Sequence, residues 1–352
     1  MQVTLPKPLR SRPLVSVVVP CYNYGHYLPQ AVDSILSQQG VDLEVIIVDD
    51  QSTDGSELVA AELAAGNPCV RVIRNEVNKR HIATYNTGLA EITGDYVVLL
   101  SADDMLAEGA LARATALMEQ YPSVGLVYGY CPDFTDVPEP SNPARTWSVW
   151  NGIDWLRAVA HRGDNVVINP EVVMRASVMK DLVGYDPAFP HAADLLLWLQ
   201  SAAISDIGRV NGVQAYYRTH AKQMHVTDYA GTLTDMRERA ALYRAFFTDE
   251  GRGAQLPGAH RMLRNALRAT AKEAVWCAVL ARIADDTVGG SDSDAFREFA
   301  LANYPKIRQT ILWRDLERRR TGRTPIIPDR QLRFAYRAKW AVKWRIWRRW
   351  GL

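Results

Sequence analysis

Short apolar runs alternate with helix-like patterns along the first 130 residues. The runs at 14–20, 43–50, 70–74, 95–100 and 124–130 are rich in Val, Ile and Leu. Continuous runs of this kind are typical of parallel strands, which are covered on both faces. Between them, residues 28–39, 57–65, 83–92 and 109–120 carry apolar side chains at helical spacing. This alternation predicts an α/β fold with a doubly wound, mostly parallel sheet.

The pattern changes after residue 131. Residues 132–145 are polar and rich in proline, which indicates a loop or a boundary. A mixed region follows, and from about residue 229 the pattern is helical. The division we predict is therefore an N-terminal lead (1–13), an α/β domain (14–228, with halves 14–131 and 146–228), a helical region (229–320), a linker (321–329) and a basic tail (330–352).

Composition places the chain among globular proteins. Of its 352 residues, 48% are hydrophobic, which is enough for a full core. No run reaches the roughly 18 apolar residues of a membrane span, and the polar start lacks an apolar signal core. The cysteines are far apart and show no metal-ligand spacing: Cys21, Cys69, Cys131 and Cys277. We expect reduced thiols and a cytoplasmic location.

The net charge of +2 hides a basic tail on an acidic body. Residues 330–352 carry eight basic side chains and no acidic one. On a helix, one face would hold Tyr336, Trp340, Trp344 and Trp347, with Arg345 and Arg348 on the other side. Aromatic faces with basic flanks suit an anionic membrane surface, so we predict peripheral binding to the inner face of the cell membrane. Docking of the tryptophans on the protein's own body is the alternative, and nucleic acid is not expected as a partner.

Carboxylates follow two of the predicted strands. Asp49 and Asp50 come after the second strand, and Asp103 and Asp104 come after the fourth. Ligands of open α/β sheets bind at the carboxyl ends of strands. Aspartates at strand ends also cap helices, but two pairs at alternate strands favour a shared site.

The turn after the first strand argues against a dinucleotide site. It reads PCYNYGHY, with one glycine where a Rossmann fingerprint needs three, and the chain has no P-loop. Phosphates would then be neutralised by a divalent cation on the strand-end carboxylates. All-oxygen ligands suit Mg²⁺ or Mn²⁺.

Several stretches together resemble the family 2 inverting glycosyltransferases of GT-A fold. The resemblance covers residues 14 to about 225 and is carried by VSVVVPCYNYGHYLPQAVDSILSQ, LEVIIVDDQSTDGS, NTGLAEITGDYVVLLSADDML, GYDPAFPHAADLLLWLQ and YYRTH. It implies a metal-dependent transferase. Such an enzyme moves a sugar from a nucleotide-diphosphate donor, most often a UDP-sugar, to a hydroxyl. The tail adds a glycan or lipid-linked acceptor to this expectation, as in cell-surface polysaccharide or glycolipid synthesis.

The resemblance also implies roles for single residues. Asp194 matches the catalytic base, and Asp104 matches the direct metal ligand, with Asp103 on the metal or the ribose. Contacts to the donor nucleotide are implied for Pro20, Tyr22, Asn23, Asp49, Asn86 and Asp103. His220 is a further metal candidate, with a surface or packing histidine as the alternative. Arg218, Arg80 and His191 are candidates for phosphate or acceptor contacts, with a surface ion pair as the alternative for Arg218 and a core or loop position for His191.

Departures from the family pattern leave alternatives open. Ser101 stands where a further aspartate is common, and Ala193 stands where an acidic neighbour of the base is usual. An inactive protein that binds sugar nucleotides or acts as a scaffold is therefore one rival. A nucleotidyltransferase is another, although the loop after the first strand lacks the basic cluster that a triphosphate needs.

Overall fold

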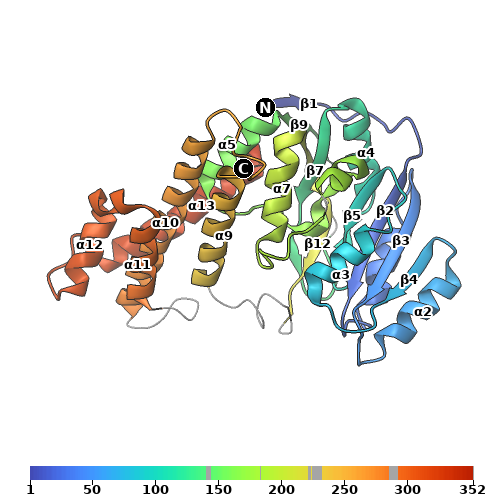
Figure 1. Cartoon of the computed structure of the whole chain (residues 1–352), viewed down its shortest axis with the longest axis horizontal. Coiled ribbons are helices and arrows are strands. Elements are labelled where there is room, and N and C mark those ends of the chain that lie inside the picture. Colours follow the sequence, from blue (N-terminus) through green and yellow to red (C-terminus); the bar gives the residue numbers. More distant parts are fainter. Residues whose placement is uncertain (140–143, 183, 221–222, 224–231, 285–291, 352) are drawn as a thin grey trace. The chain divides into compact units, whose positions relative to one another are not determined.

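The structure is a computed structural model that describes residues 1–139, 144–182, 184–220, 223, 232–284 and 292–351. It divides the chain into two compact units. The α/β unit comprises residues 1–155 and 167–220, and the helical unit comprises residues 156–166 and 221–352 (Figure 1). The sequence did not indicate that residues 156–166 join the helical unit. The boundary predicted at residue 228 lies outside the described residues.

A nine-stranded sheet organises the α/β unit. Its strands, in spatial order, are β1 (Gln2–Thr4), β9 (Trp147–Trp150), β11 (Asp206–Val213), β7 (Val124–Tyr130), β10 (Val173–Arg175), β5 (Tyr96–Leu99), β2 (Leu14–Cys21), β3 (Asp42–Asp49) and β4 (Val70–Arg74). A small second sheet has the order β6 (Met105–Leu106), β12 (Ala215–Arg218) and β8 (Asp133–Phe134). The sequence did not predict β9 to β12, because these strands are short or interrupted by polar residues.

Helices connect the strands of the α/β unit. They are α1 (Leu28–Leu36), α2 (Ser56–Gly66), α3 (Arg80–Leu89), α4 (Ala110–Gln120), α6 (Ala176–Leu182) and α7 (Ala193–Ile204), with a 3₁₀ turn η1 (Asn169–Glu171) and the start of α5 (Gly152–Arg162). The strand and helix predictions for residues 14–130 agree with these elements to within three residues. The predicted α/β class with a mostly parallel sheet is confirmed.

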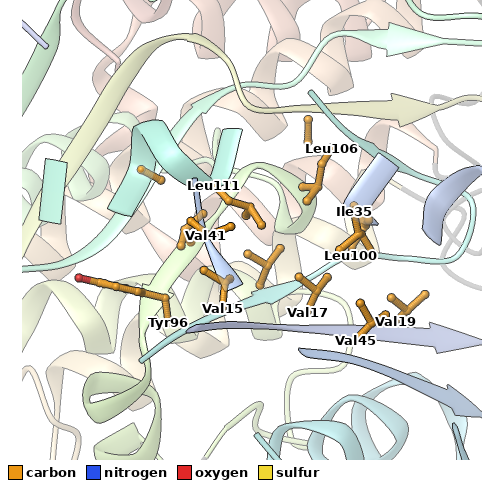
Figure 2. Packing of buried hydrophobic residues seen from close by; sticks show 14 of the residues in the cluster. Val15, Val17, Val19, Ile35, Val41, Val45, Tyr96, Leu100, Leu106 and Leu111 are labelled. Atoms are coloured by element: carbon orange, nitrogen blue, oxygen red, sulfur yellow. The ribbon is translucent and has the colours of Figure 1, made fainter. Parts of the chain in front are cut away.

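Alternating side chains place the core on both faces of the sheet. Val15, Val17 and Val19 of β2 are fully buried in one cluster with Ile35 of α1 and Leu111 of α4 (Figure 2). The other face of β2 contacts α3. A Cβ atom on Gly88 would lie 2.3 Å from the Val18 side chain, so α3 needs a glycine to approach this closely. Burial on both faces explains the continuous apolar runs.

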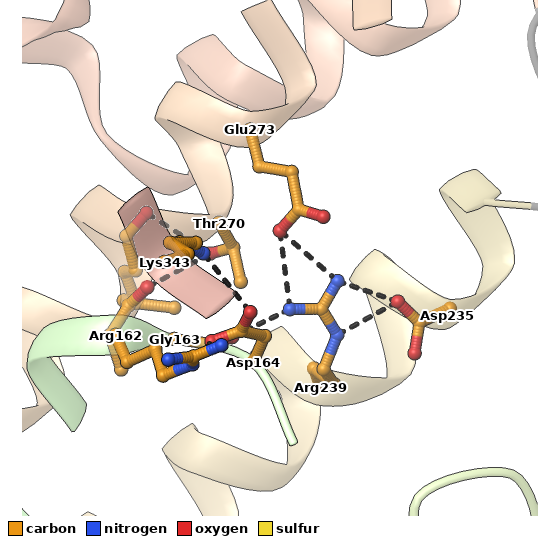
Figure 3. A network of polar contacts seen from close by, with 10 residues as sticks. Arg162, Gly163, Asp164, Asp235, Arg239, Thr270, Glu273 and Lys343 are labelled. Carbon is orange, nitrogen blue, oxygen red and sulfur yellow. Dashed lines mark hydrogen bonds and ion pairs between the residues drawn. The ribbon is translucent and has the colours of Figure 1, made fainter. Parts of the chain in front are cut away.

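The helical unit consists of α9 (Thr232–Phe247), α10 (Ala259–Ala284), α11 (Ser293–Asn303), the 3₁₀ turn η2 (Pro305–Gln309), α12 (Ile311–Arg320) and α13 (Asp329–Trp350), together with the end of α5. A polar network lies among these elements (Figure 3). Arg239 is paired with Asp235 at 2.5 Å and with Glu273 at 3.3 Å, and it donates to Gly163 O at 2.6 Å. Because both carboxylates flank a buried guanidinium, its charge is compensated.

Most of the basic tail lies in the helix α13. Leu332 lies in the core of the helical unit, and Lys343 pairs with Asp164 at 3.0 Å (Figure 3). No helix within the described residues combines the length and the apolar character that crossing a membrane requires.

Candidate active site

The ends of three parallel strands meet at one edge of the sheet. Cys21 of β2 is in register with Asp49 of β3, and the backbone of Ala102 beyond β5 bonds to Pro20. The segment 101–104 after β5 therefore lies beside the loop after β2. Asp49, Asp103 and Asp104 are all buried or nearly so. The segments that carry Asp49 and the acidic pair Asp103 and Asp104 therefore lie on either side of the end of β2.

Arg218 supplies the positive charge beside the acidic pair. Strands β6 and β12 pair antiparallel directly after Asp104, which brings the end of β12 to this point. Arg218 N donates to Asp104 Oδ1 at 2.9 Å, and Arg218 Nε donates to Asp103 O at 2.8 Å. The guanidinium also lies over the rings of Tyr27 and Phe134. Arg218 is 4% exposed, so its guanidinium is buried beside the acidic pair.

The carboxyl group of Asp104 is buried in an environment that disfavours its charge. It is 1% exposed, and its Oδ2 atom is buried with no hydrogen-bond partner among the described residues. Burial raises the pKa of this carboxyl well above its usual range, and the charge of Asp103 raises it further; the Arg218 backbone bond and charge partly offset the rise. A buried oxygen without a partner costs about 1–3 kcal/mol, and a bound cation would remove that cost.

The fit to a metal is partial when the protein's ligands alone are considered. Within the described residues, no group of three or more His, Cys, Asp or Glu side chains is placed to hold a metal ion. Mg²⁺ commonly binds through one or two carboxylates and completes its shell with water and substrate phosphates. The residues here fit that open type of site.

His220 lies directly beside Asp103. Its Nε2 atom is 3.1 Å from Asp103 Oδ2. Its ring packs against Tyr24 and Tyr27, with centroid distances of 5.4 and 5.2 Å. The structure thus brings His220 to the acidic pair and holds it there by ring contacts, which excludes the surface position.

The residues predicted to contact the nucleotide lie in or beside loops that hydrogen bonds and an ion pair hold in place. Asn23 has a φ of +59° and accepts a hydrogen bond from Thr53 N at 2.8 Å. Asp49 accepts from Ser52 N and lies 3.5 Å from Arg74 Nε. Pro20 is in register with β3, and Tyr22 is 46% exposed beside this edge. These residues line one side of the strand ends.

Asp194 lies in the first turn of α7. Its Oδ1 atom accepts from Leu195 N at 2.7 Å, and its side chain is half-buried. Tyr85 links it to the acidic pair: burial raises the pKa of Tyr85, and the charges of Asp103 and Asp194 raise it further. Both carboxylates are therefore within electrostatic range of one phenol, which the sequence did not single out.

The loop before α7 is fixed at two points by α3. Asn86 Oδ1 accepts from Tyr185 N and Asn86 Nδ2 donates to Tyr185 O, each at 2.8 Å. His81 Nε2 lies 2.9 Å from Pro190 O. The Asn86 amide is thus engaged with the backbone and is not directed at a nucleotide by these bonds. His81 and Tyr85 are four residues apart, so helical spacing was the signal that could have found this pair.

Two further candidates lie at the edges of this arrangement. Arg80, the first residue of α3, is exposed and has a φ of +64°. His191 lies in the loop three residues before Asp194 and is half-buried.

Comparisons with known proteins point to glycosyltransferases. Residues 16–179 match the family model described as glycosyl transferase family 2. The chain is 33% identical over 166 residues to the putative glycosyltransferase EpsE of Bacillus subtilis (strain 168), which covers 44% of this chain and 60% of EpsE. It is 27% identical over 227 residues to an uncharacterized glycosyltransferase of Nostoc sp. (strain PCC 7120), which covers 62% of this chain and 68% of that protein. The chain thus spans about three fifths of EpsE.

A solved structure shares the fold. The crystal structure of S. aureus TarS 1-349 has a TM-score of 0.58 and 17% identity, and the match covers 88% of this chain and 92% of that one. The same protein in complex with UDP-GlcNAc matches with a TM-score of 0.54. The predicted family resemblance is confirmed for the matched residues.

Proposed function

We propose that this chain, whose residues 16–179 match the model of glycosyl transferase family 2, transfers a sugar from a nucleotide-diphosphate donor to a hydroxyl group with inversion at the anomeric carbon. The observation that carries the proposal is the buried Oδ2 atom of Asp104, which lacks a partner at the edge where the strands end. Asp194 lies within electrostatic range of the same phenol as Asp103. The edge therefore offers a cation site and a separate carboxylate.

The acidic pair would hold the donor end. A bound Mg²⁺ or Mn²⁺ would offset the charge that develops on the leaving diphosphate. Asp104 is the proposed ligand, and Asp103 orients His220 through its 3.1 Å contact. Arg218 fixes Asp104 by its backbone N–H and neutralises part of the pair's charge. We propose that Arg218 acts through this fixed position, because its guanidinium already bonds to Asp103 O.

Asp194 would act on the acceptor. Inversion requires the acceptor oxygen to attack on the face opposite the leaving group, and a carboxylate on that side takes the hydroxyl proton. Asp194 is half-buried, and its Oδ1 atom is oriented by Leu195 N. Asn86 and His81 hold the preceding loop, so we assign them a positioning role in place of the donor contact implied for Asn86.

The donor and the acceptor are proposed by class. The similar fold that binds UDP-GlcNAc makes UDP-sugars the first donors to test. Pro20, near the end of β2, would border the base and ribose, together with Tyr22 and Asn23 in the loop that follows this strand. A glycan or lipid-linked acceptor, and a peripheral position on the inner face of the membrane, are proposed from the basic tail.

A thermal-shift screen tests the proposal. Nucleoside diphosphates are added with and without Mn²⁺, and a ligand at 100 times its Kd stabilises the folded state by about 2.7 kcal/mol. The wild type should be stabilised by one diphosphate only when Mn²⁺ is present. Asp104→Asn should lose this metal-dependent part, whereas Asp136→Asn, which changes an exposed carboxylate of the same unit, should keep it. Equal stabilisation of Asp104→Asn and the wild type would refute the metal site.

A further inference from the structure

The helix α13 turns most of its predicted membrane face toward its own unit. Trp347 is 9% exposed, and the ring of Tyr336 lies 5.7 Å from that of Trp276 in α10. Trp340 is half-buried, whereas Trp344 is 53% exposed. The Arg348 side chain, which was also predicted to contact lipid, lies outside the described part. The docking alternative thus accounts for the inner side of the helix.

Two basic residues of the tail also contact the rest of the helical unit. Lys343 pairs with Asp164 at 3.0 Å. The Lys339 ammonium lies over the rings of Trp276 and Trp340, and burial lowers the pKa of Lys339. Both lysines therefore stabilise the contact between α13 and the rest of the helical unit.

The opposite side of α13 remains exposed and has a distinct composition. We call it the outer face, and it consists of Arg333, Phe334, Arg337, Val342, Arg345 and Ile346. Phe334 is 73% exposed, Val342 52% and Ile346 45%. The three arginines are exposed as well, and the sequence has no acidic residue after Asp329.

We infer that the outer face of α13 binds the surface of an anionic lipid bilayer. The arginines match the negative charge of lipid headgroups, and the aliphatic side chains between them match the acyl boundary beneath. A second copy of the same face would bring arginines against arginines, which opposes self-association. Nucleic acid would attract the arginines but would leave the exposed Val342 and Ile346 without a favourable environment.

Because the inner side of α13 is docked, the outer face is firmly attached to the helical unit. A free amphipathic tail would tether the protein loosely, whereas a helix packed on the helical unit through Leu332 and Tyr336 carries that unit with it. The inference does not depend on sugar transfer, and its test uses no activity measurement.

Charge reversal on the outer face tests the inference. The full chain is incubated with vesicles of phosphatidylcholine mixed with phosphatidylglycerol, and with vesicles of phosphatidylcholine alone, and co-sedimentation is measured. The wild type should bind only the anionic vesicles, and rising salt should weaken the binding. The variant R333E/R337E/R345E should bind on the order of 100-fold more weakly, because each basic residue near the surface contributes roughly fivefold.

The matched control lies on another helix of the same unit. R261E/R264E/R268E changes the net charge equally, on three exposed arginines of α10, and should keep vesicle binding. Equal loss in both triple variants, or no binding by the wild type, would overturn the proposal. Thermal unfolding of each variant should match the wild type, because the changed side chains are exposed.

A second variant separates lipid from nucleic acid. V342S/I346S removes aliphatic surface and no charge, so vesicle binding should weaken severalfold while the salt dependence stays the same. If vesicle binding is unchanged in V342S/I346S and the wild type binds a single-stranded oligonucleotide more tightly than it binds the vesicles, the occupant is nucleic acid and the lipid inference is wrong.

Discussion

The buried carboxyl of Glu171 should make the stability of the α/β unit fall as pH rises. Glu171 ends the turn η1 and is 1% exposed, and its Oε1 atom accepts from Ile168 N at 3.1 Å. Burial raises its pKa from 4.5 to about 8, although two backbone hydrogen bonds and the charge of Arg209 oppose the rise. The folded state therefore binds the proton more tightly than the unfolded state does.

The sign and the size follow from linkage. A raised pKa contributes stability that is fully present below the unfolded pKa of 4.5 and is lost as pH rises through about 8. Between about pH 5 and about pH 8, the loss is on the order of 3 kcal/mol. For a unit of this size, that corresponds to a Tm lowered by roughly 5–10 °C.

The assay compares the wild type with Glu171→Gln by thermal unfolding across this pH range. The amide cannot ionise, so the Tm difference, wild type minus variant, should become more negative as pH rises. A pH-independent penalty for the amide cancels in this trend. If the difference grows more positive with pH instead, Glu171 is ionised in the folded state and its pairing with Arg209 outweighs burial.

The remaining predictions concern the two bonds that fix the loop before α7. Asn86→Ala removes both bonds to Tyr185, and turnover should fall on the order of tenfold while donor affinity is unchanged, because each bond contributes about 0.5–1.5 kcal/mol to holding the loop. His81→Phe keeps the ring beside Tyr85 and removes one bond to Pro190, so the fall in turnover should be smaller. A lowered donor affinity in Asn86→Ala would contradict the positioning role and would support a direct contact between Asn86 and the donor nucleotide.

The first half of the fold could be predicted because burial on both faces of β2, β3 and β5 leaves continuous apolar runs. The strands β10 and β12 could not be predicted in this way. Val173–Arg175 is three residues long and pairs antiparallel between β5 and β7, so its identity depends on partners distant in the sequence. Short strands carry too little periodicity to indicate their state.

The acidic edge of the site was predictable, because carboxyl ends of parallel strands meet. Its electrostatics were not, since they depend on tertiary contacts. Arg218 reaches Asp104 only because β12 pairs with β6, which lies more than 100 residues earlier. Tyr85 was not singled out from the sequence, and the effect of the Asp103 and Asp194 charges on its phenol becomes apparent only in the fold.

For the basic tail, the sequence predicts the faces of the helix but not their environment. A helical projection of α13 identifies which side chains share a face, and Tyr336 and Trp347 do lie on one side. The projection cannot say which face packs on the protein. Leu332 lies in the core of the helical unit and Trp347 is buried, so the aromatic face is largely used in folding, and the arginines remain for a partner.

Turnover by Asp194→Asn tests the central claim most directly. Release of nucleoside diphosphate is measured with sugar donors that carry the nucleotide identified by the Mn²⁺-dependent thermal screen, and with a glycan or lipid-linked acceptor. The account predicts that Asp194→Asn binds the donor as the wild type does, because the amide keeps the shape of the carboxylate, and that turnover falls by about 10²-fold or more. Asp136→Asn serves as the control and should turn over normally. Turnover by Asp194→Asn within a few-fold of the wild type would show that Asp194 is not the base.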